Sequence, residues 1–156
     1  MATRIVNGIE ELRTIVGQEI GLSDWLLVDQ QRITQFAETT EDRQWIHLDA
    51  ERAAVESPYR STIAHGFLTL SLLSELSREA VDIQGDFKMR INYGLNRVRF
   101  PAPVLAGSRL RGRFALVSVD DFEGDGGVQV VWNVVVEVEG GAKPALVAEW
   151  VTRLYV

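Results

Sequence analysis

The sequence predicts an α+β fold with a mainly helical first half and a second half of alternating strands. Before Gly85 the apolar residues recur mostly at helical spacing, and after it they recur at every second position. Runs of one element type followed by runs of the other are typical of α+β proteins. With 156 residues and no repeat, linker or low-complexity tract, the chain is expected to form one domain over residues 1–156.

The first half is expected to open with a strand and two short helices. Residues 23–28 have the pattern of a first strand. Asp29 can then cap a helix over residues 30–39 by accepting a hydrogen bond from a free backbone N–H. Asp49 is a second expected cap, of a short helix that includes residues 53–55. A loop must therefore join these two helices.

A longer helix is expected from His65 or Gly66 to about Val81. Its apolar positions cover more than one stripe, so we expect this helix to be buried on several sides. These positions are Phe67, Leu68, Leu70, Leu72, Leu73, Leu76 and Ala80. Polar residues interrupt the region, and it is too short to span a bilayer.

The second half predicts an antiparallel sheet. Three arginines alternate along residues 109–114 and share one face, and residues 128–138 alternate in the same way. One face of the second strand carries Val128, Val130, Trp132, Val134, Val136 and Val138. Glycine-rich turns at residues 124–127 and 140–141 separate the strands, and residues 145–155 are expected to form the last one.

The composition excludes several classes of protein. A net charge of −6 argues against general nucleic-acid binding. The absence of cysteine excludes disulfides and thiolate chemistry and suits a cytoplasmic protein, as does an N-terminus without the apolar core of a signal peptide. The nucleotide-binding glycine loops, the nucleophile elbow and the zinc-protease motif are also missing from the sequence.

One segment is basic although the chain is acidic overall. It runs from Lys88 to Arg113 and contains no Asp or Glu. Its cations are Lys88, Arg90, Arg97, Arg99, Arg109, Arg111 and Arg113. We interpret most of them as solvated outer positions of strands, with some available to meet a phosphate of the substrate.

The two histidines of the chain lie close to possible catalytic partners. His47 follows Asp42 by five residues, which is about 500° around a helix, so the side chains converge only if a loop or bend separates them. Converged, they would supply an acid/base pair. In the alternative interpretation, Asp42 caps a turn and His47 is a partly buried structural residue.

Gly66 follows His65 at the expected start of the long helix. A glycine lets a ligand approach the backbone closely, and the first N–H groups of a helix have no internal partner. The Gly66 N–H can therefore hold a carbonyl oxygen that gains negative charge. We interpret His65 itself as structural. A metal site made by His47, His65 and Asp49 is a further option, which the ligand spacing does not favour.

Together these motifs resemble those of the MaoC-like dehydratases, specifically the (R)-specific (type-2) enoyl-CoA hydratases. The family pattern is an Asp, four intervening residues, a His and, further along, an Ile/Val-x-His-Gly-Phe/Met helix start. Asp42, His47 and residues 63–67 match it. A strand motif over residues 99–104 with Gly107 also matches, so the likeness covers nearly the whole chain.

Three positions depart from the family pattern. Glu41 stands where the family usually has Gly, Gln44-Trp45 where Asn-Pro is frequent, and Ser108 where an Asp is common. The acid/base pair is kept. The departures therefore concern the shape of the loop and the preference for the acyl chain, and we expect Trp45 to help shape the acyl tunnel.

The resemblance implies a hot-dog fold, in which an antiparallel sheet wraps around one long central helix, and a homodimer whose sheets join edge to edge. It also implies reversible addition of water to a trans-2-enoyl-CoA to give an (R)-3-hydroxyacyl-CoA. Asp42 and His47 would be the catalytic residues and the Gly66 N–H the oxyanion donor. The coenzyme A thioester is the substrate, and no cofactor or metal is implied.

Three other functions remain open at this point. A hot-dog acyl-CoA thioesterase would share the fold and the substrate class but would release free coenzyme A. A non-catalytic acyl-CoA-binding or partner subunit would keep the fold without turnover, and the altered loop around Glu41 and Trp45 favours this reading somewhat. A metal-dependent hydrolase is the least favoured. Neither a nucleic acid nor a membrane is expected as a partner.

Overall fold

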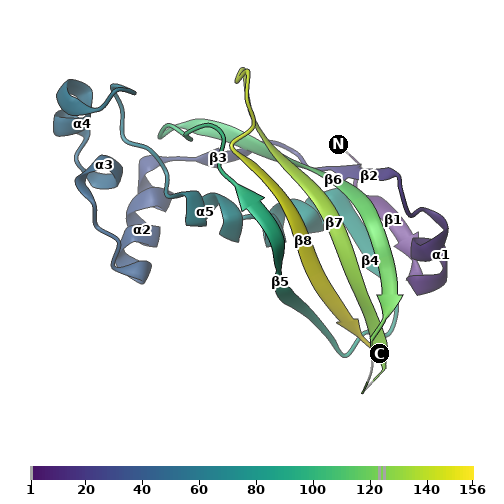
Figure 1. Cartoon of the computed structure of the whole chain (residues 1–156). Coiled ribbons are helices and arrows are strands. Elements are labelled where there is room, and N and C mark those ends of the chain that lie inside the picture. Colours follow the sequence, from purple (N-terminus) through teal and green to yellow (C-terminus); the bar gives the residue numbers. More distant parts are fainter. Residues whose placement is uncertain (1, 123, 125) are drawn as a thin grey trace.

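A curved antiparallel sheet packs against a helical segment in the computed structural model, which describes residues 2–122, 124 and 126–156 (Figure 1). The strands follow the order β2-β6-β7-β8-β5, and β3 pairs with the other end of β6. Their bounds are β2 Glu19–Leu22, β3 Leu26–Val28, β5 Met89–Arg99, β6 Ser108–Asp121, β7 Gly127–Val138 and β8 Leu146–Tyr155. The predicted antiparallel sheet is therefore confirmed.

Alternation along β6 and β7 decides which face of the sheet meets the core. The predicted apolar face of β7 is buried, from Val128 at 1% exposure to Val136 at 0%. On β6 the inward positions Leu110, Phe114 and Leu116 are each at most 1% exposed, while the arginines between them face outward. The predicted turn at residues 140–141 is present, with Gly140 at φ +71. In the predicted turn at residues 124–127, Asp125 lies outside the described residues.

The helix beneath the sheet consists of two consecutive segments, α5 (Gly66–Ser71) and α6 (Leu73–Ala80). The residue between them, Leu72, keeps helical backbone angles, so the chain follows one continuous path. Leu68, Leu73, Leu76 and Ala80 are buried as predicted. Phe67 is an exception at 68% exposure. It lies in the first turn of α5, where the burial pattern leaves one side of the helix open to solvent.

The N-terminal region differs from the prediction. A strand β1 (Arg4–Asn7) pairs in parallel with β4 (Val81–Gln84), and a helix α1 (Gly8–Thr14) follows β1. Strands of four residues carry little periodic signal, and their pairing joins segments far apart in the sequence. The predicted strand at residues 23–28 is confirmed only for its last three residues, which form β3, and it follows β1 and β2 instead of being the first strand.

Three short helices lie at one end of the sheet, on the left in Figure 1. They are α2 (Gln30–Thr40), α3 (Trp45–Leu48) and α4 (Ala50–Glu56). Both predicted caps are confirmed, since Asp29 accepts a hydrogen bond from the Arg32 N–H and Asp49 accepts one from the Arg52 N–H, each at 2.9 Å. Among the residues that the structure describes, every helix is too short or too polar to cross a lipid bilayer.

Candidate active site

The loop that carries Asp42 begins with a left-handed turn. Helix α2 ends at Glu41, whose φ is +62, and the Arg43 N–H donates to the Glu41 carbonyl at 3.1 Å. A bidentate pair between Arg43 and Glu38, at 3.2 and 3.0 Å, ties the loop back to the helix. Left-handed backbone favours glycine, so the Gly of the family pattern given above would suit this position better than Glu41 does. The turn supplies the bend that the spacing of Asp42 and His47 requires.

His47 is held in one orientation and one tautomer. It lies in the single turn of α3 and is 7% exposed. Its Nδ1 is 2.7 Å from the Ile63 carbonyl oxygen, which can only accept, so Nδ1 carries the proton. Its own carbonyl accepts a hydrogen bond from the Gln30 side chain at 2.8 Å. These contacts leave Nε2 as the basic nitrogen of the ring.

His65 contacts both members of the predicted pair. Its ring stacks on that of His47, with centroids 3.7 Å apart and an interplanar angle of 22°. Its Nε2–H donates to the Asp42 carbonyl oxygen at 2.9 Å and lies 4.0 Å from the Asp42 carboxylate. Phe36 packs on the same ring at a centroid distance of 5.0 Å. The interpretation of His65 as a structural residue therefore agrees with these contacts, and its Nδ1 is buried without a partner among the described residues.

The structure brings Asp42 and His47 together. One ring nitrogen of each histidine and one carboxylate oxygen of Asp42 all lie within 4.8 Å of one another. A single water molecule that makes two hydrogen bonds of normal length can bridge this separation. The Asp42 side chain is 56% exposed, so solvent reaches its carboxylate, whereas His47 is buried. Both features of the alternative interpretation are present as well, since the Gln44 N–H donates to Asp42 Oδ1 at 3.5 Å and the buried His47 is hydrogen-bonded to Ile63.

Gly66 begins α5 next to this pair. Leu68 and Thr69 donate to the His65 carbonyl, whereas the Gly66 N–H has no acceptor among the described residues. A β-carbon at Gly66 would lie 3.2 Å from the Phe100 ring, so a larger residue would crowd this approach. A pocket of about 240 Å³ opens here. It is lined by Tyr59, Ile63, Ala64, Gly66, Thr69, Phe100, Pro101, Ala102, Pro103, Val104 and Ala145.

Burial keeps the imidazole of His47 neutral at ordinary pH. It lowers the pKa of His47 below the usual 6.5, and the neighbouring His65 acts in the same direction. The Ile63 carbonyl and the Asp42 carboxylate oppose this shift without cancelling it. A neutral ring with a free Nε2 can accept a proton from water.

The donor atoms do not fit the metal site considered from the sequence. Asp49 is occupied as the cap of α4, so it is not part of the cluster. Asp42 takes its place beside His47 and His65, but Nδ1 of His47 and Nε2 of His65 both donate to carbonyl oxygens. The two rings are also nearly parallel, so their remaining lone pairs do not converge on one point.

Three of the seven cations of the basic segment are neutralised by carboxylates within the protein. Arg109 pairs with Glu139, Arg111 with Glu137, and Arg113 with both Glu137 and Glu19. This agrees with their interpretation as outer strand positions. Within residues 2–122, 124 and 126–156, the cations of the segment without a carboxylate partner are Lys88, Arg90, Arg97 and Arg99. Arg99 directly precedes Phe100, which packs over Gly66.

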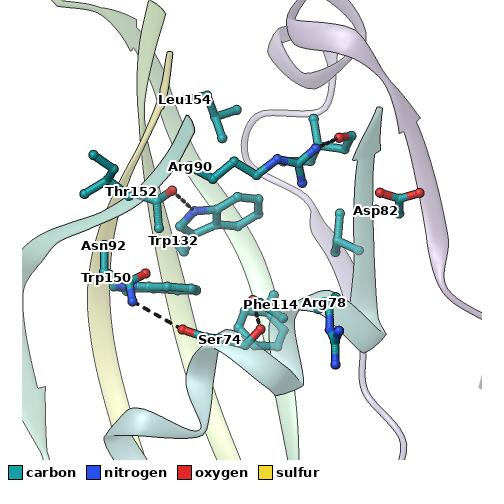
Figure 2. Close-up of a pocket in the computed structure, with 14 residues that line it drawn as sticks. Ser74, Arg78, Asp82, Arg90, Asn92, Phe114, Trp132, Trp150, Thr152 and Leu154 are labelled. Atoms are coloured by element: carbon teal, nitrogen blue, oxygen red, sulfur yellow. Dashed lines mark hydrogen bonds between the residues drawn. The ribbon is translucent and has the colours of Figure 1, made fainter. Parts of the chain in front are cut away.

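A second pocket, of about 320 Å³, lies at the far end of the helix (Figure 2). Its walls come from α6, β4, β5 and the concave face of the sheet. The labelled residues are Ser74, Arg78, Asp82, Arg90, Asn92, Phe114, Trp132, Trp150, Thr152 and Leu154. The sequence placed Trp132 on the inner face of a strand but gave no signal that a cavity adjoins it.

Comparison with known proteins agrees with this geometry. The family model of the MaoC-like domain matches residues 11–138 of this chain. A 3-hydroxyacyl-thioester dehydratase Z of Mycobacterium tuberculosis is 49% identical over 150 residues, which are 96% of this chain and 97% of that protein. Among solved structures, a monoamine oxidase regulatory protein of Archaeoglobus has a TM-score of 0.77 at 22% identity. The match covers 99% of this chain and 98% of that protein's chain.

The structure of an R-hydratase, PhaJ1 of Pseudomonas aeruginosa, has a TM-score of 0.64 at 25% identity. The match covers 88% of this chain and 79% of the PhaJ1 chain. The chain belongs to the MaoC-like dehydratase family. It therefore has the hot-dog fold that the sequence predicted, and it is a hydro-lyase of the hydratase and dehydratase class.

Replacing Glu41 by Gly should stabilise the fold without loss of activity. A left-handed L-residue costs roughly 1–2 kcal/mol, and the extra unfolded-state freedom of glycine offsets part of the gain, so we expect the free energy of unfolding to rise by up to about 1 kcal/mol. The matched control is Thr40→Gly, in the last turn of α2, which should lower it by about 0.5–1 kcal/mol. Urea denaturation measures both, and a Glu41→Gly variant less stable than wild type would contradict the argument.

The buried His47 also predicts a pH dependence. Because its pKa is lowered, the base stays neutral at pH 6.5, and kcat/KM should decline only below that value. Below pH 6.5 the unfolded chain binds a proton that the folded chain does not, so the free energy of unfolding should fall in the same range. A pH–rate profile and urea denaturation at several pH values measure these effects. An acid limb centred above pH 6.5 would contradict the assignment.

Proposed function

We propose that this protein hydrates trans-2-enoyl-CoA thioesters reversibly to (R)-3-hydroxyacyl-CoA. The observation that carries the proposal is that Asp42 and His47 lie within 4.8 Å of each other, a separation that one water can bridge, beside the unpaired N–H of Gly66. The dehydratase of Mycobacterium tuberculosis and the R-hydratase described above support the substrate class.

The chemistry follows from the positions of these groups. The Gly66 N–H would donate to the thioester oxygen and draw electron density from C3 of the enoyl group. Asp42 and Nε2 of His47 would hold one water, whose oxygen attacks C3 as it loses a proton to this pair. The resulting enolate takes a proton at C2 on the same face, which regenerates the neutral thioester. Water addition and its reversal then use the same groups.

No metal, flavin or nicotinamide takes part in this scheme, because each proton moves between water, the two side chains and the substrate. Coenzyme A enters as part of the substrate.

We propose that Arg97 and Arg99 bind the phosphates of coenzyme A, since Arg109, Arg111 and Arg113 already pair with carboxylates. Arg99→Ala should then raise KM for the thioester, and Arg109→Ala should leave KM unchanged.

We also propose a cytoplasmic location for the protein, which its cysteine-free composition supports.

Replacing either catalytic side chain should abolish most of the activity. Asp42→Asn and His47→Gln should each lower kcat by about 10²–10⁴, the range for acid/base catalysis. The matched control is Asp49→Asn, because asparagine caps a helix as well as aspartate and the residue lies outside the site. Loss of the conjugated thioester absorbance of crotonyl-CoA follows the reaction, and chiral analysis identifies the product.

The outcomes separate the competing functions. Release of free thiol, detected with a thiol-reactive dye, would identify a thioesterase. Tight binding of crotonyl-CoA without any product would identify a non-catalytic subunit. Wild-type turnover in both Asp42→Asn and His47→Gln would remove the assigned roles.

We also propose that two copies of the chain associate through β5. This strand pairs only with β8 among the described strands, so its other edge is free. An open apolar strand edge is a ready surface for pairing with another chain. Its exposed apolar residues are Met89, Ile91, Tyr93 and Leu95, at 38–56% exposure.

Leu95→Asp should therefore convert a dimer into a monomer, because it places a charge in the middle of the joined edge. The control is Val55→Asp, a residue on α4 that is 74% exposed and lies outside β5. Size-exclusion chromatography with light scattering measures the mass of each variant. A wild-type protein that is monomeric at all concentrations would contradict the proposal.

A further inference from the structure

We infer that Gln30 is a positioning residue of the proposed reaction, because its side-chain amide holds the main chain of His47 and thereby keeps the ring in its place beside Asp42. The inference rests on the proposed function, since it concerns the base of the same reaction. It is carried by a hydrogen-bond network that ends on both the main chain and the ring of His47. Gln30 does not line the pocket at Gly66, so it would act through His47.

The helix that carries His47 is too short to hold this residue by itself. α3 has four residues, and its internal bonds include those from the His47 N–H to the Gln44 carbonyl at 3.0 Å and from the Asp49 N–H to the Trp45 carbonyl at 2.9 Å. An isolated turn is unstable, because fixing its backbone costs more entropy than its few bonds offset. The position of His47 therefore depends on hydrogen bonds from other segments.

The Gln30 side chain supplies such a bond and uses both ends of its amide. Nε2 donates to the His47 carbonyl oxygen at 2.8 Å, and since that oxygen can only accept, the orientation of the amide is fixed. Nε2 also lies 3.3 Å from the Thr34 hydroxyl. The amide oxygen accepts from the hydroxyl of Thr62, which is 3% exposed, at 2.5 Å. Gln30 thus joins the main chain of His47 to Thr62.

The residue after Thr62 receives the ring of His47. Ile63 accepts the Nδ1 proton, and its own N–H donates to the Ile46 carbonyl at 3.1 Å. The bonds therefore form a closed circuit, from the His47 carbonyl through Gln30, Thr62 and Ile63 back to the His47 ring. A shift of the His47 main chain must break one of these bonds, so ring and main chain are positioned together.

Both ends of the Gln30 bridge are anchored at neighbouring residues just before β6. The Thr62 carbonyl accepts from the Ala106 N–H at 3.0 Å. On the other side, Gln30 begins α2 two residues after Val28, whose carbonyl accepts from the Gly107 N–H at 2.8 Å. The amide therefore links α3, which lies beside α2 at one end of the sheet (Figure 1), to a frame that both anchors share.

Gln30→Met tests the inference, because methionine has a similar length and cannot form these hydrogen bonds. A displaced base slows proton transfer without weakening substrate binding, so kcat should fall about tenfold while KM for crotonyl-CoA stays the same. The matched control is Gln35→Met, the same change at an exposed position of α2, which should leave both constants unchanged. Urea denaturation shows the conditions in which each variant is fully folded, and kcat is measured there.

Nitrogen-15 NMR of the imidazoles gives a readout that a merely structural role would not move. The chain has two histidines, and their contacts assign them opposite tautomers, Nδ1–H in His47 and Nε2–H in His65. In Gln30→Met the ring nitrogens of His47 should move toward the values of a mixed tautomer, whereas His65 should keep its tautomer. In Gln35→Met both rings should match wild type.

Thr62→Val removes the hydroxyl that orients the amide and leaves Gln30 in place. It should lower kcat in the same way but less, and the double variant Gln30→Met/Thr62→Val should be no slower than Gln30→Met, because Thr62 acts through Gln30. If Gln30→Met does not fold, kcat and the His47 spectrum of Thr62→Val decide the question.

A folded Gln30→Met variant with the kcat and the His47 spectrum of wild type would overturn the inference. A higher KM at unchanged kcat would overturn it too, since Gln30 would then serve binding. Additive losses in the double variant would contradict the network. If wild-type protein does not hydrate crotonyl-CoA, the proposed function fails, and the ring spectra still decide whether Gln30 positions His47.

Discussion

The hydrogen bond from the His47 ring to the Ile63 carbonyl is the contact on which the rest of the site depends. At 2.7 Å it places the ring proton on Nδ1 and opposes the lowering of the His47 pKa by burial. It also joins α3 to the segment that leads into α5, so the proton acceptor and the Gly66 N–H are held by the same stretch of backbone.

His65 adds a second link between the same parts. It binds the backbone of Asp42, stacks on His47 and directly precedes Gly66, so one buried ring connects the three functional positions. The turn at Glu41 brings the aspartate to this ring, at the cost of a left-handed residue that is not glycine. Backbone strain of this kind persists where the surrounding contacts determine the conformation.

The two pockets have different characters. The one at Gly66 is lined by proline-rich backbone after β5, and the far one has aromatic rings and polar groups. The first pocket lies at the start of α5, and the second lies against α6 and β4.

The sequence by itself determined the class of fold, the alternation of β6 and β7, and the helix caps at Asp29 and Asp49, because these depend on local periodicity and spacing. The roles of Asp42, His47 and Gly66 stay predictions that come from the resemblance. Only the tertiary structure decided that Asp42 and His47 converge, that Arg109, Arg111 and Arg113 are paired, and that a cavity adjoins Trp150. The short parallel pair of β1 and β4 and the break between β2 and β3 were likewise beyond the sequence. Each depends on contacts between residues distant along the chain, and such contacts leave no periodic signal.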